Sequence, residues 1–187
     1  MLEITENTIN KVNTLLSDIP NGAERAFANA INRALDKGKN TAYKAATSEY
    51  KLKRSTIDSY TTNKIVKATQ GDICGTLVFA GEQIPLYKYE GVKPSGPDKG
   101  KSTVYVGQKT IQALEHAFYI NVTAKKEGIF ERDTKRRTPI NQLMGSSMRS
   151  MVSQPPIMEK VKKDAQETLE KRLDQEINRL LAGYGGR

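Results

Sequence analysis

The segment between residues 23 and 35 constrains the fold most strongly, because its apolar residues recur every three or four positions and most of them are alanine. These positions are Ala23, Ala26, Phe27, Ala30, Ile31, Ala34 and Leu35. The spacing is typical of an amphipathic helix, and Asn21 with Glu24 forms an N-x-x-E capping signal at its start. Alanine is small, so a partner element can approach this face closely. Gly38 is expected to end or loosen the helix, which then resumes to Tyr50.

The C-terminal segment predicts a second long helix, from Ile157 to Ala182, with Gly183 just beyond its end. Its apolar residues are spaced by four: Ile157, Val161, Ala165, Leu169, Leu173 and Ile177. Each such step advances about 40° beyond a full turn, so the two ends of this row should point to opposite sides. We expect one end to pack on the chain's own sheet. The other end, with Ile177, Leu180 and Leu181, is expected to contact a neighbouring subunit; the alternative is a helix that bends around its own core.

Between these helices the sequence predicts short strands, because β-branched and aromatic residues gather between glycines. The expected strands cover residues 65–69, 73–80, 83–89, 103–106, 117–123 and 128–132. Ala80-Gly81-Glu82 looks like a hairpin turn, and residues 124–127 join the last two strands as another hairpin. Residues 2–16 and a segment opened by a Ser55–Asp58 capping box predict two short helices. Residues 90–102 read as a flexible loop.

Together these elements predict an α+β fold, in which a small, mainly antiparallel sheet packs with the alanine-rich helix and the C-terminal helix. We expect residues 1–20 to be a helical extension, 21–182 a single domain and 183–187 a flexible C-terminus. The polar N-terminus is not a signal peptide, and no stretch approaches the roughly 20 apolar residues needed to span a bilayer. Cys74 is the only cysteine, so we expect a reducing cytoplasm.

The formal net charge is +9, which favours a polyanionic or acidic neighbour. The excess lies in residues 37–67 and 124–137, whereas residues 157–182 carry six basic and six acidic side chains. If the two basic segments formed one patch, it would suit DNA binding, which we keep as the alternative function. The simpler reading of these charges is a solvated face.

Sequence motifs for catalysis, metal binding and cofactor binding are absent, so we expect neither an enzyme nor a cofactor. His116 is the only histidine, and one histidine with Cys74 is too few for a zinc site of the usual spacing. A catalytic triad could use only His116 as its base, and no G-x-S-x-G elbow is present to support one. Residues 96–102 resemble a phosphate-binding loop, but only three residues separate the two glycines and a strand follows. A hydrolase or nuclease is supported only by the presence of carboxylates.

The most distinctive stretch is residues 128–147, GIFERDTKRRTPINQLMGSS. It resembles the prophage minor tail protein Z family of long-tailed bacteriophages, which has a phenylalanine and an arginine, a basic turn, a Pro-Ile pair and a short segment ending in glycine. Other matches follow in the same order: the alanine-rich helix running into Tyr43, Tyr50 and Leu52-Lys53, then Gly81 with Ile84-Pro85-Leu86, then Ala117-Phe118-Tyr119-Ile120, then the C-terminal helix. The resemblance covers residues 22–182.

The resemblance implies a virion structural protein that acts in tail completion or head-tail joining by binding. Its expected partners are other tail or head-tail connector proteins, further copies of itself in a ring, and DNA passing through the tail. It would be located in the bacterial host cytoplasm during assembly and then in the virion tail. Within the basic turn, Arg132, Lys135, Arg136 and Arg137 suit contacts with carboxylates of a tail neighbour. The alternative is that they satisfy groups within the chain.

Overall fold

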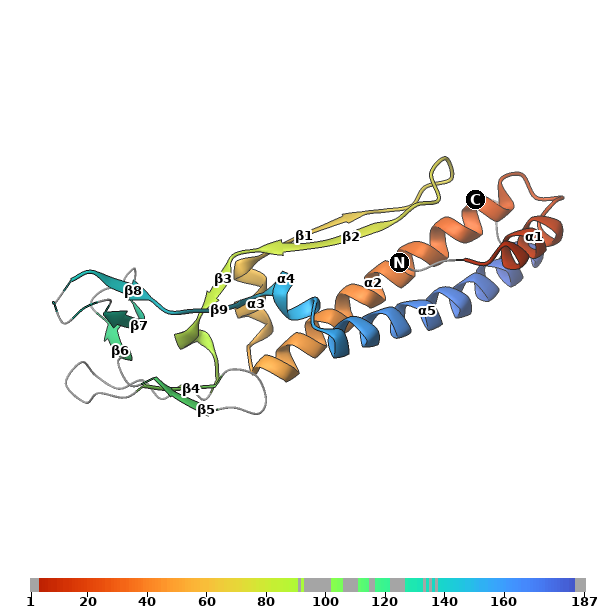
Figure 1. Ribbon diagram of the computed structural model, residues 1–187. Helices are drawn as coiled ribbons and strands as arrows, with labels where there is room; N and C mark the ends of the chain where they lie inside the picture. Colours follow the sequence, from red (N-terminus) through yellow and green to blue (C-terminus); the bar gives the residue numbers. More distant parts are fainter. Residues whose placement is uncertain are drawn as a thin grey trace. The chain divides into compact units, whose positions relative to one another are not determined.

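The computed structural model describes residues 4–90, 92, 102–105, 111–114, 117–121, 127–132, 134, 136 and 138–183. It is a mixed α+β chain with long helices and small antiparallel sheets, which confirms the predicted class (Figure 1). The chain divides into two compact units. The helical unit comprises Met1–Ala42, Asn63–Val78 and Pro155–Arg187, and the strand unit comprises Tyr43–Thr62 and Phe79–Gln154. The domain predicted over residues 21–182 spans both units.

The helical unit is built from α1 (Glu6–Leu15), α2 (Gly22–Tyr50, whose last turns belong to the strand unit) and α5 (Pro155–Leu181). One apolar core joins all three helices. Its buried members are Val12, Leu16, Ala23, Ala26, Phe27, Ala30, Ala34, Leu169, Leu173, Ile177 and Leu180. The segment predicted as an extension therefore contributes to the main core of this unit. Of the apolar residues of α1, Ile9 and Leu15 are exposed, whereas Val12 is buried.

Of the two capping residues predicted for the long helices, Gly183 has the expected geometry and Asn21 does not. Asn21 directly precedes α2 with φ 51°, whereas a capping residue normally has an extended backbone. At the C-terminus of α5, Gly183 has φ 80° and its N–H donates to the Leu180 carbonyl at 3.0 Å, as a C′ glycine should.

The two long helices pack side by side in opposite directions (Figure 1). Asn29 Nδ2 donates to Glu176 Oε2 at 3.0 Å, and Thr41 Oγ1 donates to Asp164 Oδ2 at 2.7 Å, so rising numbers on α2 match falling numbers on α5. Gly38 lies buried in this seam, and α2 passes through it without interruption. The predicted break at Gly38 is wrong, because packing along the seam outweighs the roughly 1 kcal/mol by which glycine disfavours a helix.

Another side of α2 contacts the hairpin of β1 (Thr61–Val66) and β2 (Thr76–Gly81). The Asn32 amide accepts from the Ala68 N–H at 2.9 Å and donates to the Ala68 carbonyl at 3.0 Å, which fixes the connecting loop 67–75 on the helix. A side chain at Gly75 would come within 2.7 Å of Ile31, so the loop approaches α2 closely.

The hairpin turn predicted at residues 80–82 is wrong, because β2 pairs with β1 and not with the strand that follows. Gly81 has φ 148°, and a Cβ there would lie 2.8 Å from Thr61 Cα. Glu82 N–H then donates to the Tyr60 carbonyl at 3.0 Å. This turn leads the chain from the β1–β2 pair into β3 (Gln83–Pro85), which pairs with β9 (Met144–Ser147).

The strand unit also contains the predicted hairpin of β6 (Ala117–Asn121) and β7 (Glu127–Arg132), which is confirmed as an antiparallel pair. Further elements are α3 (Arg54–Tyr60), η1 (Leu86–Lys88), β4 (Ser102–Tyr105), β5 (Ile111–Leu114), β8 (Ile140–Gln142) and α4 (Met148–Val152). The predicted strand 83–89 ends at Pro85, which has no N–H to continue the ladder, and a 3-10 turn follows.

The Ser55–Asp58 capping box is wrong, although the short helix it predicted exists as α3. Lys53 occupies the cap position and makes no side-chain cap hydrogen bond, while Ser55 already lies in the first turn. Asp58 instead forms an ion pair with Arg54 at 3.8 Å. The helix start was therefore predicted from the wrong residue.

Residues 140–147, for which no helix or strand was predicted, connect two of the sheets. β8 pairs with β7, and β9 pairs with β3. Between them, Leu143 N–H donates to the Ile129 carbonyl at 2.8 Å and the Leu143 carbonyl accepts from Leu86 N–H at 3.1 Å. Residues 140–147 of the distinctive stretch thus link the β6–β7–β8 sheet to the β3–β9 pair.

Candidate functional site

Of the four basic residues proposed as contacts, the structure describes Arg132 and Arg136, while Lys135 and Arg137 lie outside the described residues. Arg132 ends β7, and its guanidinium lies 5.0 Å from the centre of the Phe118 ring. Such stacking uses the flat face of the guanidinium and leaves its in-plane N–H donors directed elsewhere. Arg136 N–H donates to Thr134 Oγ1 at 3.2 Å, which shapes the basic turn.

The three apolar residues proposed as a subunit contact behave differently from the prediction. Ile177 and Leu180 are 8% and 2% exposed, because they lie in the core shared with α1 and α2. Only Leu181, at 53%, is presented to solvent. The alternative, a helix that packs along its own core, describes this end of α5.

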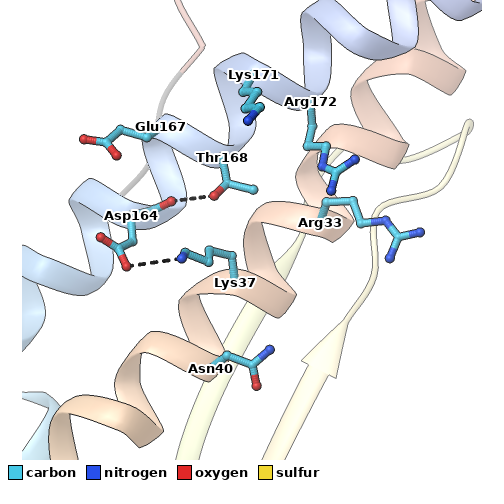
Figure 2. A pocket seen from close by; sticks show the side chains of 8 residues that line it. All are labelled: Arg33, Lys37, Asn40, Asp164, Glu167, Thr168, Lys171 and Arg172. Atoms are coloured by element: carbon cyan, nitrogen blue, oxygen red, sulfur yellow. Dashed lines mark hydrogen bonds and ion pairs between the residues drawn. The ribbon is translucent and has the colours of Figure 1, made fainter.

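A polar groove beside the α2–α5 seam is the candidate site that sequence reasoning missed. It has a volume of about 450 Å³ and lies wholly within the helical unit. Figure 2 shows the side chains from both helices that line it, with Lys37 directed toward Asp164. The charged ones are Arg33 and Lys37 of α2, and Asp164, Glu167, Lys171 and Arg172 of α5.

Asp164 is the anchored carboxylate of this groove. It accepts a hydrogen bond from Thr41 at 2.7 Å and forms an ion pair with Lys37 at 3.6 Å. The Thr41 hydroxyl, followed by the Lys37 charge, holds the pKa of Asp164 below its ordinary value although partial burial opposes this. Asp164 is therefore ionised at neutral pH and neutralises Lys37.

The remaining cations of the groove have weaker partners. Arg172 donates to the neutral Gln175 oxygen at 2.9 Å. Glu167 pairs with Lys163 at 4.0 Å, a residue that does not line the groove. Within the described part of the chain, the side chains of Arg33 and Lys171 form no hydrogen bond or ion pair. Four cations and two carboxylates line the groove, so its described lining carries net positive charge.

The sequence contained a weak signal for this groove. Arg33 and Lys37 stand one turn apart on a predicted helix, and Lys171-Arg172 is a basic pair on the other. Counting charge over the whole C-terminal helix gave neutrality and hid the local pair. Only the pairing of the two helices brings the two signals together.

The basic residues of segment 37–67 are distributed over α2, the connection between α2 and α3, α3, β1 and the loop after β1 rather than gathered on one element. Lys37 pairs with Asp164, and Arg54 pairs with Asp58. Arg54 also lies 4.8 Å from the centre of the Tyr43 ring. Of segment 124–137, Lys125 and Lys126 lie outside the described residues.

A second polar hollow, of about 520 Å³, lies between α2 and the loop of the β1–β2 hairpin, where Asn32 holds Ala68. Cys74 in that loop is exposed, and His116 lies outside the described residues. Where the structure describes the chain, no three histidine, cysteine or acidic side chains gather as metal ligands would. The described helices include none with the length and apolar character needed to span a bilayer.

Comparison of the chain with protein-family models, with curated proteins and with solved structures finds no match.

Proposed function

We propose that this chain is a structural protein of a bacteriophage or prophage tail, which acts in tail completion or head-tail joining by binding its neighbours. The observation that carries the proposal is the sequence of residues 128–147, with its resemblance to minor tail proteins. That stretch supplies β7, β8 and β9 of the strand unit. A motif in that position is suited to holding a binding surface in a fixed shape.

In this proposal the protein works by binding and not by catalysis. Arg132 stacks on Phe118, so the direction of its guanidinium is restricted before a partner arrives. A restricted arginine loses less side-chain entropy when it pairs with a carboxylate, and its planar donors fit that group in two-point contact. Further copies of the chain would assemble with the symmetry of the tail, in the host cytoplasm, before becoming part of the virion.

The test measures binding of the purified protein to tail tubes of the same phage, by size exclusion with light scattering and by electron microscopy. We expect a closed oligomer, or binding restricted to tube ends. Arg132→Gln should weaken tube binding by about tenfold or more, because it removes a charged contact at the interface. Arg149→Gln on α4, which removes a charge from another exposed side chain, is the matched control.

Two results would contradict the proposal. One is a monomer that ignores tubes. The other is equal loss of tube binding in both variants, which would mean that only the overall charge matters. A monomer that ignores tubes and binds duplex DNA with an affinity that falls steeply with salt would instead support the DNA-binding alternative.

A further inference from the structure

We infer that the groove between α2 and α5 is a docking site for acidic side chains of a partner protein. The inference deepens the proposed function by naming the chemistry of one partner. It rests on that function in one respect, namely that the partner is a protein. The groove lies in the helical unit, whereas Arg132 lies in the strand unit, so the two contacts can be tested separately.

The cations of the groove come from helices that the seam holds at matching levels. On α2, Arg33 lies between Asn29 and Thr41, which contact Glu176 and Asp164 of α5. Lys171 and Arg172 lie in the part of α5 between those two partners. Arg33 therefore faces the same stretch of the groove as Lys171 and Arg172, as Figure 2 shows.

Three cations at one level, without a carboxylate bound to any of them, repel one another. Within the described residues, Arg33 and Lys171 have no side-chain partner and Arg172 has only Gln175. The two carboxylates lining the groove are already engaged, Asp164 with Thr41 and Lys37, and Glu167 with Lys163. An anion placed between α2 and α5 at this level would relieve the repulsion and satisfy the arginine donors.

The surroundings favour a carboxylate on a protein over the backbone of a nucleic acid. Asp164 and Glu167 line the same groove as the cations, so the positive charge is a short cluster and not the continuous basic row that a nucleic-acid backbone needs. The rest of α5 adds no net positive charge, because its four basic residues outside the groove are balanced by four acidic ones. A mixed site of this kind fits one or two glutamate or aspartate side chains flanked by neutral or basic neighbours.

The test uses the full chain and a labelled short peptide of alternating glutamate and serine, with a glutamine-serine peptide as the neutral probe. Binding is followed by fluorescence anisotropy at about 0.1 M salt, where distant charges are largely screened. We expect the glutamate peptide to bind and the glutamine peptide not to bind. Arg33→Gln combined with Arg172→Gln should weaken binding by about tenfold or more.

The matched control combines Lys11→Gln with Lys162→Gln, which removes the same charge from exposed positions outside the groove. It should keep the peptide affinity within about twofold, because a distant surface charge contributes little. Circular dichroism of both variants checks that the helices remain. A chain that binds the two peptides alike, or equal weakening in the groove variant and the control, would overturn the inference.

Duplex DNA serves as the competing ligand. If the groove variant loses affinity for duplex DNA more than for the glutamate peptide, the site belongs to a nucleic acid and the inference is wrong. Failure here is distinguishable from failure of the tail proposal. Loss of peptide binding with intact tube-end binding removes only the groove, and peptide binding without tube binding removes only the tail function.

Discussion

Two glycines, one in each unit, lie where elements touch, and they differ in how much space surrounds them. A Cβ on Gly38 would meet Ala165 at 3.6 Å and Val161 at 3.7 Å, which is ordinary contact across the α2–α5 seam. A Cβ on Gly145 would meet the Tyr89 ring at 2.6 Å, and Tyr89 is only 4% exposed. The α2–α5 seam of the helical unit therefore has room for a methyl group at Gly38, whereas the strand unit inserts a buried ring where a glycine leaves space.

The largest effect should come from the helical core. Leu173→Ala removes a buried side chain between α1, α2 and α5, and it should lower the free energy of unfolding by about 3 kcal/mol through lost burial and a cavity. Chemical denaturation measures the change. Lys162→Ala, an exposed site on the same helix, should change stability by less than about 0.5 kcal/mol. A similar small change for Leu173→Ala would mean that α5 does not pack as described.

Gly145→Ala sharpens the comparison directly. The new methyl group must displace the Tyr89 ring, whose hydroxyl accepts from Ser146 N–H at 2.9 Å, so we expect a loss of about 2 kcal/mol. A double-mutant cycle with Tyr89→Ala tests the cause, since the cost of the methyl should largely vanish without the ring. An unchanged cost in that background would show that the strain lies in the backbone.

Tyr89 also makes the strand unit sensitive to alkali. Burial raises the pKa of Tyr89 to about 12, although its hydrogen bond to Ser146 acts in the opposite direction. In the unfolded chain the phenol ionises near its ordinary pKa of 10, so stability is complete below that pH and falls as the pH rises to about 12. The expected loss is about 1–2 kcal/mol. Denaturation of Tyr89→Phe should lack this alkaline fall while having a lower stability at neutral pH.

Gly38→Ala should have the opposite sign to Gly145→Ala. The seam has room for a methyl group, and alanine favours a helix more than glycine does, so we expect stabilisation by about 0.5–1 kcal/mol. Thermal unfolding measures the shift. A destabilised variant would mean that the seam is as tightly filled as the contact around Tyr89, and the contrast between the two units would disappear.

The smallest effect concerns the groove. Because the pKa of Asp164 is lowered in the folded chain, its contribution is complete above the ordinary aspartate pKa and is lost as the pH falls through the lowered value. Thr41→Val removes the largest cause of that shift and should reduce the acid-dependent loss by about 0.5 kcal/mol, since the carboxylate is partly exposed. Denaturation between neutral and acidic pH compares the variant with the wild type. Identical pH profiles would contradict the role of Thr41.

Local pattern predicted the elements well where the pattern was long. The apolar rows of α2 and α5, the Gly183 terminus and the β6–β7 hairpin all follow from residues close together in the chain. The same reasoning failed at Gly38 and Gly81. From local sequence alone, a glycine predicts a helix end or a turn, because its backbone is flexible. The segments that pack around it determine which conformation it adopts.

The contact residues selected from the sequence agree with the structure only in part. Arg132 was selected from the sequence and is exposed, yet its Phe118 contact depends on the pairing of β6 with β7. Ile177 and Leu180 were selected as contacts between subunits, and they are buried because α1 and α2 cover that end of α5. Apolar periodicity predicts that a helix face will be covered, but it does not show whether the covering element belongs to the same chain or to another subunit.

The sequence by itself determined that this chain has two long amphipathic helices, short strands between them, and basic pairs at Arg33–Lys37 and Lys171–Arg172. Tertiary structure alone decided that β3 pairs with β9, that α1 joins the core, and that Arg33 shares a groove with Lys171 and Arg172. The physical reason is the range of the forces involved. Helix and strand formation depends on neighbouring residues, whereas pairing and charge clustering depend on which distant segments pack at the same level.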